Sequence, residues 1–237
     1  VAMRQLWNCM LILCALTAQA AGSIADSTSS TSITTDSIRL RVLITEGRAL
    51  LYQRPDTALQ ILKEATALAN KLQLPSAECE AMAWSGVAYY VLAEYDQAMP
   101  LFVEARRLAT ISKNHNGLAT ALNGMGLIYQ TQHLYEKAIV YHKESMRHAR
   151  AGNNYERVTA NYFNIGLAYD ELALYDSALH YLATSQHLST ENNLHRLMLM
   201  TLNRMAKVYF HKRNYNKADS LYQAALRYRE INDNWER

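Results

Sequence analysis

Apolar residues in this chain recur at helical spacing, and one arrangement of apolar and polar positions returns every 40 residues. In each copy, an aromatic residue or a proline is followed by a polar residue, any residue and an alanine. Five copies at a fixed interval predict a repeat architecture in which each unit is a pair of helices. The copies are Pro55-Asp56-Thr57-Ala58, Tyr95-Asp96-Gln97-Ala98, Tyr135-Glu136-Lys137-Ala138, Tyr175-Asp176-Ser177-Ala178 and Tyr215-Asn216-Lys217-Ala218.

We interpret each copy as the start of the second helix of a pair. Its polar residue is the expected N-cap, because the side chain can accept a hydrogen bond from an unpaired backbone N–H. Its alanine has no atom beyond Cβ, so a neighbouring helix can approach closely. First helices are predicted at about 37–53, 76–93, 116–133, 155–173 and 195–213, and second helices at about 56–72, 96–112, 136–151, 176–190 and 216–231. Asp36 and Ser37 are the predicted caps of the first of these helices.

The links support an antiparallel arrangement. Links within a pair are predicted to contain one or two residues, which makes the paired helices antiparallel. Links between pairs contain Asn and Gly, as in Gly152-Asn153-Asn154, and these residue types suit a positive φ after a helix. The expected fold is an all-α, right-handed solenoid of five antiparallel helix pairs over residues 37–237. The repeats are placed at about 37–75, 76–115, 116–154, 155–194 and 195–234.

Further positions repeat with the same period and are expected to form the packing faces. In the second unit they are Gly86, Tyr89, Ala98, Phe102 and Ala105, and in the fifth they are Ala206, Tyr209, Ala218, Tyr222 and Ala225. This order of small, aromatic and alanine positions resembles that of tetratricopeptide repeats. The resemblance covers residues 37–237 and implies a protein-binding superhelix. The 40-residue period of this chain exceeds the family's usual repeat length of about 34 residues. In this it resembles the long-period arrays of bacterial regulators and sensors.

Composition narrows the function classes. Half of the residues are hydrophobic, and 8 Gly and 3 Pro in 237 residues suit a helical protein. The formal charge of +3 is too small, and the Lys and Arg residues too dispersed, to predict binding of nucleic acid. Cys79 is the one thiol left after residues 1–21, and its place at the start of a repeat helix predicts a small buried hydrophobe rather than a nucleophile.

The N-terminus has the pattern of a signal peptide over residues 1–21. Arg4 precedes a mostly apolar run, and Ala18-Gln19-Ala20 is a small-x-small cleavage motif. A buried or interfacial helix is the alternative, and lipidation of Cys14 is disfavoured because Leu13 precedes it. Residues 22–36 are rich in Ser and Thr and are expected to be a disordered tether. The array is therefore expected on the periplasmic or extracellular side.

No motif predicts an enzyme, a cofactor or a metal site. Phosphate-binding loops, nucleophile elbows and metalloprotease motifs are missing from the sequence. His142 occupies the position of Phe102 one repeat later, so packing is its expected role. The other histidines considered as pairs lack Cys or carboxylate partners at ligand spacing and are expected to be solvated; they are His180 with His187, and His195 with His211.

The resemblance places the binding surface on the concave side, where the first helices of such arrays receive peptides or partner helices. The candidate residues lie beside the small-residue and tyrosine positions but off their packing face; they are Trp84, Tyr90, Asn123, Phe163, Asn164, Asn203, Arg204 and Lys207. Asn164 and Arg204 match positions with which family members clamp a peptide backbone and its terminal carboxylate. The match is incomplete at Leu127 and Met200, and ordinary solvated groove residues are the alternative.

Two functions fit these observations. The first is a non-catalytic protein- or peptide-binding region on the extracytoplasmic side of a larger, membrane-anchored bacterial regulator with a histidine kinase or helix-turn-helix output. Trp235-Glu236-Arg237 matches the start of a sixth unit, which suggests that the chain continues beyond residue 237. The alternative is a free periplasmic or secreted scaffold that assembles other proteins.

Overall fold

The computed structural model describes residues 35–232, which form helices and short links with no strand among them. The first helix covers residues 35–50. It is followed by α2 (Pro55–Lys71), α3 (Pro75–Val91), α4 (Tyr95–Ile111), α5 (His115–Thr131), α6 (Tyr135–Ala151), α7 (Tyr155–Glu171), α8 (Tyr175–Glu191), α9 (His195–His211) and α10 (Tyr215–Asn232). The all-α repeat fold is thus confirmed. The predicted signal peptide, the tether up to residue 34 and the start of a sixth unit lie outside the described residues.

The 40-residue period arises from uniform helices and uniform links. Each helix from α2 to α9 has 17 residues. Each link between them has three residues, whether it lies within a pair or between pairs. The prediction of shorter links within pairs was therefore wrong. The tether was also predicted two residues too long, because residues 35 and 36 are already helical.

The links share one backbone conformation. The middle residue of each link from 72–74 to 212–214 has a positive φ of 54–61°. In link 72–74, the N–H of Leu74 donates to the carbonyl of Ala69 and that of Gln73 to the carbonyl of Asn70, both at 3.0 Å, which is a Schellman motif. Only two of the eight positive-φ residues are Asn and none is Gly, so packing of the flanking helices imposes this conformation rather than residue type.

The helix starts differ from the prediction by one residue. The polar residue of the repeated pattern is the second residue of its helix, and the N-caps Glu94, Leu134 and Leu174 make no side-chain capping bond. Asp36 and Ser37 likewise lie inside a helix instead of capping it. The acidic residues of the pattern in α2, α4, α6 and α8 instead lie in the first turn, where negative charge complements the helix dipole.

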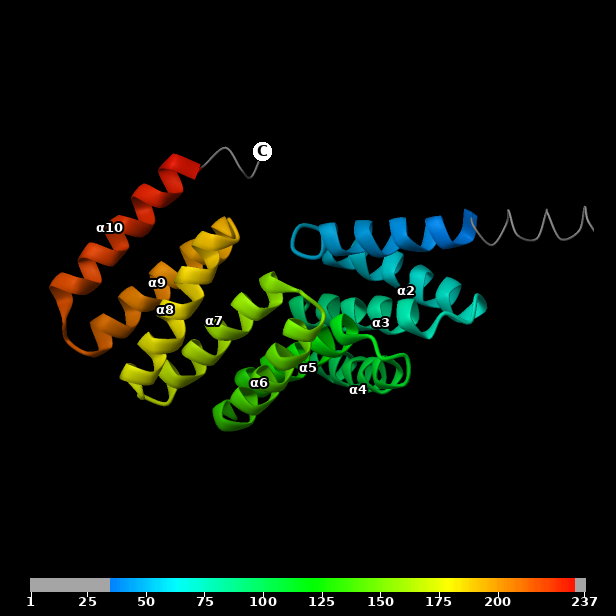
Figure 1. Ribbon diagram of the computed structural model, residues 1–237, viewed down its shortest axis with the longest axis horizontal. Coiled ribbons are helices and arrows are strands. Elements are labelled where there is room, and N and C mark those ends of the chain that lie inside the picture. Colours follow the sequence, from blue (N-terminus) through cyan, green and yellow to red (C-terminus); the bar gives the residue numbers. More distant parts are fainter. Residues whose placement is uncertain (1–34, 233–237) are drawn as a thin grey trace, which may run out of the picture.

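The helices form two layers of a curved array (Figure 1). Residues 35–50 with α3, α5, α7 and α9 are called the inner helices, and α2, α4, α6, α8 and α10 the outer helices. From α3 onward, neighbouring inner helices contact one another, whereas the outer helices make no such contact within the described part of the chain. The array therefore curves, and the surface of the inner helices is called the inner surface.

The predicted packing positions meet as the repeat requires. The backbones of Gly86 and Gly126 lie against the rings of Phe102 and His142, so that an added Cβ would come within 2.7 Å of either ring. The alanines of the pattern at 98, 138 and 178 are fully buried. His142 is confirmed as a packing residue, because it is also fully buried. That burial lowers the pKa of its imidazole to about 3.

Candidate binding surface

The predicted groove asparagines of the third and fourth pairs are brought together. The Nδ2 atom of Asn164 donates to Oδ1 of Asn123 at 3.0 Å, and both side chains are buried. The side chain of Gln130 donates to the backbone carbonyl of Asn164, also at 3.0 Å. These amides join α5 to α7, so much of their hydrogen-bonding capacity is already used within the chain.

Arg204 and Lys207 also meet partners within the chain. Nη1 of Arg204 lies 3.2 Å from Oδ2 of Asp170 and 3.3 Å from Oε1 of Glu171. The Nζ atom of Lys207 lies 3.6 Å from the same Glu171 oxygen. The guanidinium that the sequence assigned to a peptide carboxylate is thus directed at carboxylates of α7. Asn203, the neighbour of Arg204, is exposed on α9.

Two predicted groove aromatics contribute mainly to packing. Phe163 is 6% exposed and belongs to a core cluster with Leu182 and Val208. Tyr90 is partly buried, and its ring lies 5.6 Å from that of Tyr95. Burial raises the pKa of the Tyr90 phenol. Neither ring is a freely exposed stacking surface.

Trp84 is the predicted groove residue with the most unusual surroundings. The guanidinium of Arg48 lies over its ring, 4.6 Å from the centroid, and that of Arg157 lies over it at 5.4 Å. Arg48 comes from the first pair and Arg157 from the fourth, although Trp84 belongs to the second. The inner surface is therefore curved tightly enough for α7 to reach α3 past α5.

A second arginine–aromatic contact joins the two ends of the array. The guanidinium of Arg196, in the first turn of α9, lies 4.2 Å from the ring centroid of Tyr52 in the link 51–54. Figure 1 shows this link and the start of α9 facing each other across the opening of the array. We call Arg48, Arg157 and Arg196, with Trp84 and Tyr52, the arginine cluster.

The arginine cluster concentrates positive charge with little compensation. Within residues 35–232, no carboxylate lies within 4.0 Å of the guanidinium nitrogens of Arg48, Arg157 or Arg196. The Nε atom of Arg157 is buried and has no hydrogen-bond partner there. Burial lowers the pKa of the Arg157 guanidinium; the neighbouring Tyr52 and Glu156 oppose this shift, and the charge of Arg48 adds to it. Such a cluster can attract and orient an anion.

Sequence reasoning found Trp84 but missed the other four members of the cluster. Arg157 and Arg196 lie in the first turns of their helices, far along the chain from the small-residue positions used to select groove residues. Tyr52 lies in the link 51–54, although the sequence placed it inside a helix over 37–53, and no groove candidate was chosen from the first pair. Only the curvature of the array brings these side chains together, and no local sequence pattern encodes it.

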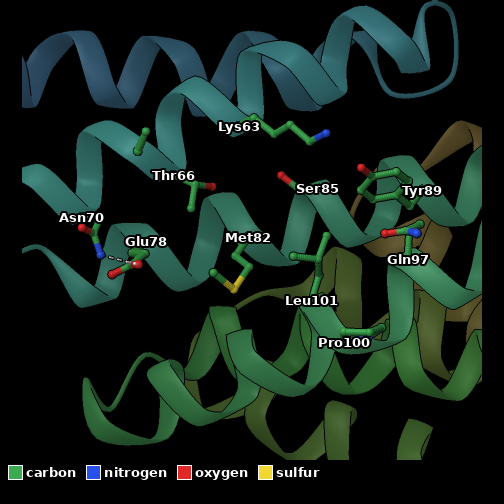
Figure 2. A pocket seen from close by; sticks show the side chains of 11 residues that line it. Lys63, Thr66, Asn70, Glu78, Met82, Ser85, Tyr89, Gln97, Pro100 and Leu101 are labelled. Atoms are coloured by element: carbon green, nitrogen blue, oxygen red, sulfur yellow. Dashed lines mark hydrogen bonds between the residues drawn. The ribbon is translucent and has the colours of Figure 1, made fainter.

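A cavity on the other side of α3 is a separate feature (Figure 2). It has a volume of about 580 Å³ and lies between the outer helices α2 and α4. At one end Asn70 donates to Glu78 at 3.0 Å, and at the other Lys63 lies over the ring of Tyr89. Met82 is part of the lining between these ends. None of the predicted groove residues lines this cavity.

Among residues 35–232, no helix is long and apolar enough to cross a membrane, and no group of three or more His, Cys, Asp or Glu side chains is arranged to hold a metal ion. Cys79 is buried, as predicted, and burial raises the pKa of its thiol to about 11. A thiol with that pKa is a poor nucleophile at neutral pH.

Comparison with known families and structures agrees with this architecture. Residues 78–151 and 118–186 match a family model described as tetratricopeptide repeat. No curated protein matches the chain.

Several solved structures are similar in fold. A Rap protein complexed with Competence and Sporulation Factor is 17% identical, with a TM-score of 0.71, over 81% of this chain and 54% of that one. Aspartyl phosphate phosphatase F from Bacillus subtilis is 16% identical, with a TM-score of 0.59, over 81% and 60%. BtubC (BKLC) from P. vanneervenii is 17% identical, with a TM-score of 0.61, over 85% and 91%. The chain thus spans little more than half the length of the first two, and these likenesses show the fold alone.

Proposed function

The chain is a tetratricopeptide-repeat protein, and from this premise we propose that it is a binding scaffold whose protein or peptide ligand docks on the inner surface. The observation that carries the proposal is the arginine cluster, where cationic side chains from the first, fourth and fifth pairs converge on that surface. A Rap protein of similar fold has been solved in complex with Competence and Sporulation Factor, which supports ligand binding by arrays of this shape. The scaffold acts by binding and not by catalysis.

We further propose that the array is the extracytoplasmic sensory or interaction region of a membrane-anchored regulator. The support is the signal-peptide pattern of residues 1–21. A free periplasmic or secreted scaffold is the second candidate. Extending the reading frame separates the two, because a regulator requires a run of about 20 apolar residues after the last repeat. A stop codon within one helix of residue 237 would favour the free scaffold.

A site-specific cross-linking experiment tests the docking surface. A photoreactive amino acid is placed at Asn203, which is exposed on the inner helix α9, or at Val140, which is 62% exposed on the outer helix α6. Cells producing each variant are irradiated, and the cross-linked proteins are identified by mass spectrometry. A product that forms reproducibly from position 203 and not from position 140 supports docking on the inner surface. Products from position 140 alone would refute it.

A further inference from the structure

We propose that the arginine cluster is an anion-binding site that takes a multiply charged oxyanion ligand, bearing carboxylate or phosphate groups, and holds it between the two ends of the array. The inference rests on the proposed function, because it names the ligand class for the same inner surface. The residues of the arginine cluster come from the first, second, fourth and fifth helix pairs.

The charge of the cluster sets the ligand class. Four other arginines among the described residues have carboxylate partners, as Arg39 has Glu64 and Arg107 has Glu104, and several more have none. The three cluster arginines have none within residues 35–232 and stack on aromatic rings instead. Their formal charge of about +3 at neutral pH is matched by a ligand that carries two or more negative charges.

The position of two cluster arginines favours an anion further. Arg157 is the third residue of α7 and Arg196 the second residue of α9. A positive charge in the first turn opposes the helix dipole, and the N-terminal turn itself attracts anions. An anion bound beside these first turns offsets the unfavourable interaction of each arginine with its helix dipole.

Stacking leaves the guanidinium edges free for the ligand. A guanidinium that lies over an aromatic ring keeps its N–H groups in its own plane, where two of them can donate to one carboxylate or phosphate group. The Nε atom of Arg157 is buried without a hydrogen-bond partner, so the cost of its burial is uncompensated until an acceptor reaches it. Arg48 and Arg196 are exposed, so a ligand can reach the cluster from solvent.

The site also links binding to the shape of the array. The contact of Arg196 with Tyr52 joins residues of the fifth and first pairs, 144 positions apart in the sequence. A ligand that contacts Arg196 of the fifth pair and Arg48 of the first pair together bridges the same ends and therefore favours the closed array over more open ones.

Calorimetric titration of the full chain at low ionic strength tests the site. The probes are inorganic phosphate, citrate and a peptide of six glutamates. We expect saturable binding of at least one probe, weakened at least tenfold in Arg157→Gln and in the double variant Arg48→Gln/Arg196→Gln. The double variant alters two exposed side chains and so keeps the test valid if Arg157→Gln unfolds. Arg147→Gln is the matched control, because Arg147 is 73% exposed on the outer helix α6.

The outcomes separate this site from the proposed function. If citrate or phosphate binds as tightly as the peptide, the site is assigned to a free anion. If the peptide alone binds, the site is assigned to an acidic protein segment. Both outcomes support the oxyanion site. Equal affinities of wild type and both cluster variants, or no binding of any probe, would overturn it. If the product from position 203 still forms in Arg157→Gln, docking on the inner surface stands while the anion site fails as the docking determinant.

Discussion

The carboxylate of Asp170 is fully buried, and the guanidinium of Arg204 lies 3.2 Å from it, so that α9 supplies the countercharge of α7. The other carboxylate oxygen of Asp170 lies 2.9 Å from Nδ1 of His211, also on α9. A buried carboxylate is stable only while its partners remain, since water cannot replace them. Arg204 therefore joins the fourth and fifth pairs, whatever else it contacts.

Replacing Arg204 with alanine is expected to destabilise the array by roughly 2–4 kcal/mol, because Asp170 is left buried with His211 as its remaining partner. The value lies at the lower end for broken buried pairs because Arg204 is one-fifth exposed. Urea unfolding followed by circular dichroism measures the loss. Lys207→Ala is the control and should cost less than about 1 kcal/mol, since its pair with Glu171 is partly solvated. Equal losses in the two variants would contradict the assignment.

Gly124 is predicted to be irreplaceable while Phe102 is present. A Cβ atom at position 124 would lie 2.2 Å from Cζ of the fully buried Phe102 ring. Gly124→Ala should therefore lower stability by about 1–3 kcal/mol through overpacking. Adding Phe102→Leu, which copies Leu182 of the fourth unit, should recover part of the loss.

Thermal unfolding of Gly124→Ala, Phe102→Leu and the double variant measures this coupling. Gly152→Ala is the matched control. Its Cβ would meet the side-chain end of Asn116, which can move, and φ of Gly152 is −92°. The control should change stability by less than about 0.5 kcal/mol. Purely additive effects of the first two substitutions would show that the ring does not require the glycine.

A buried polar pair replaces two alanines between the third and fourth units. The side-chain amide of Asn161 donates to the hydroxyl of Ser145 at 2.9 Å, and that hydroxyl donates to the carbonyl of Ala119 at 2.7 Å. The corresponding residues one repeat earlier are Ala105 and Ala121.

Ser145→Ala alone should cost about 1–3 kcal/mol, because it removes two buried hydrogen bonds and leaves the Asn161 amide with only the carbonyl of Arg157 as a partner. Ser145→Ala/Asn161→Ala, which recreates the Ala105–Ala121 pair, should cost less than the sum of the single losses. Chemical unfolding of all four proteins checks this coupling. A double variant as unstable as the summed singles would show that the two side chains act independently.

Much of the fold could be predicted from the sequence because the repeat is a local signal. The Ala of each pattern copy marks a packing face, and its period placed the helices to within a few residues. The link length and the N-caps were mispredicted, because the positive φ at residues such as Ala93 and Ala173 is imposed by tertiary packing and not by residue type.

The site was less accessible to the same reasoning. Trp84 was identified from the sequence, but its contact with Arg157 was not. That contact, and the one between Arg196 and Tyr52, arise only through the accumulated rotation of successive pairs. Arg204 was assigned to a ligand because its position matched a family pattern, whereas its partner Asp170 lies on the preceding inner helix. Pairing between units depends on superhelical geometry, which a single unit does not specify.

His142 should make the array sensitive to moderate acid. Burial lowers the pKa of its imidazole from the ordinary value of 6.5 to about 3, so the folded protein keeps it neutral. At a pH between about 3 and 6.5, the unfolded chain binds a proton at His142 that the folded chain does not. The free energy of unfolding therefore falls as the pH falls below 6.5. At pH 4.5 the contribution amounts to about 2–3 kcal/mol.

The variant His142→Leu isolates this contribution, since Leu182 fills the same position one repeat later and the remaining histidines are unchanged. Urea unfolding of both proteins at pH 7.5, 5.5 and 4.5 should show a smaller loss of stability for the variant, with the difference growing as the pH is lowered. The reason is that leucine has no proton to gain on unfolding. Parallel curves for the two proteins would mean that His142 is protonated equally in the folded and unfolded states, which would contradict its burial as a neutral imidazole against Gly126.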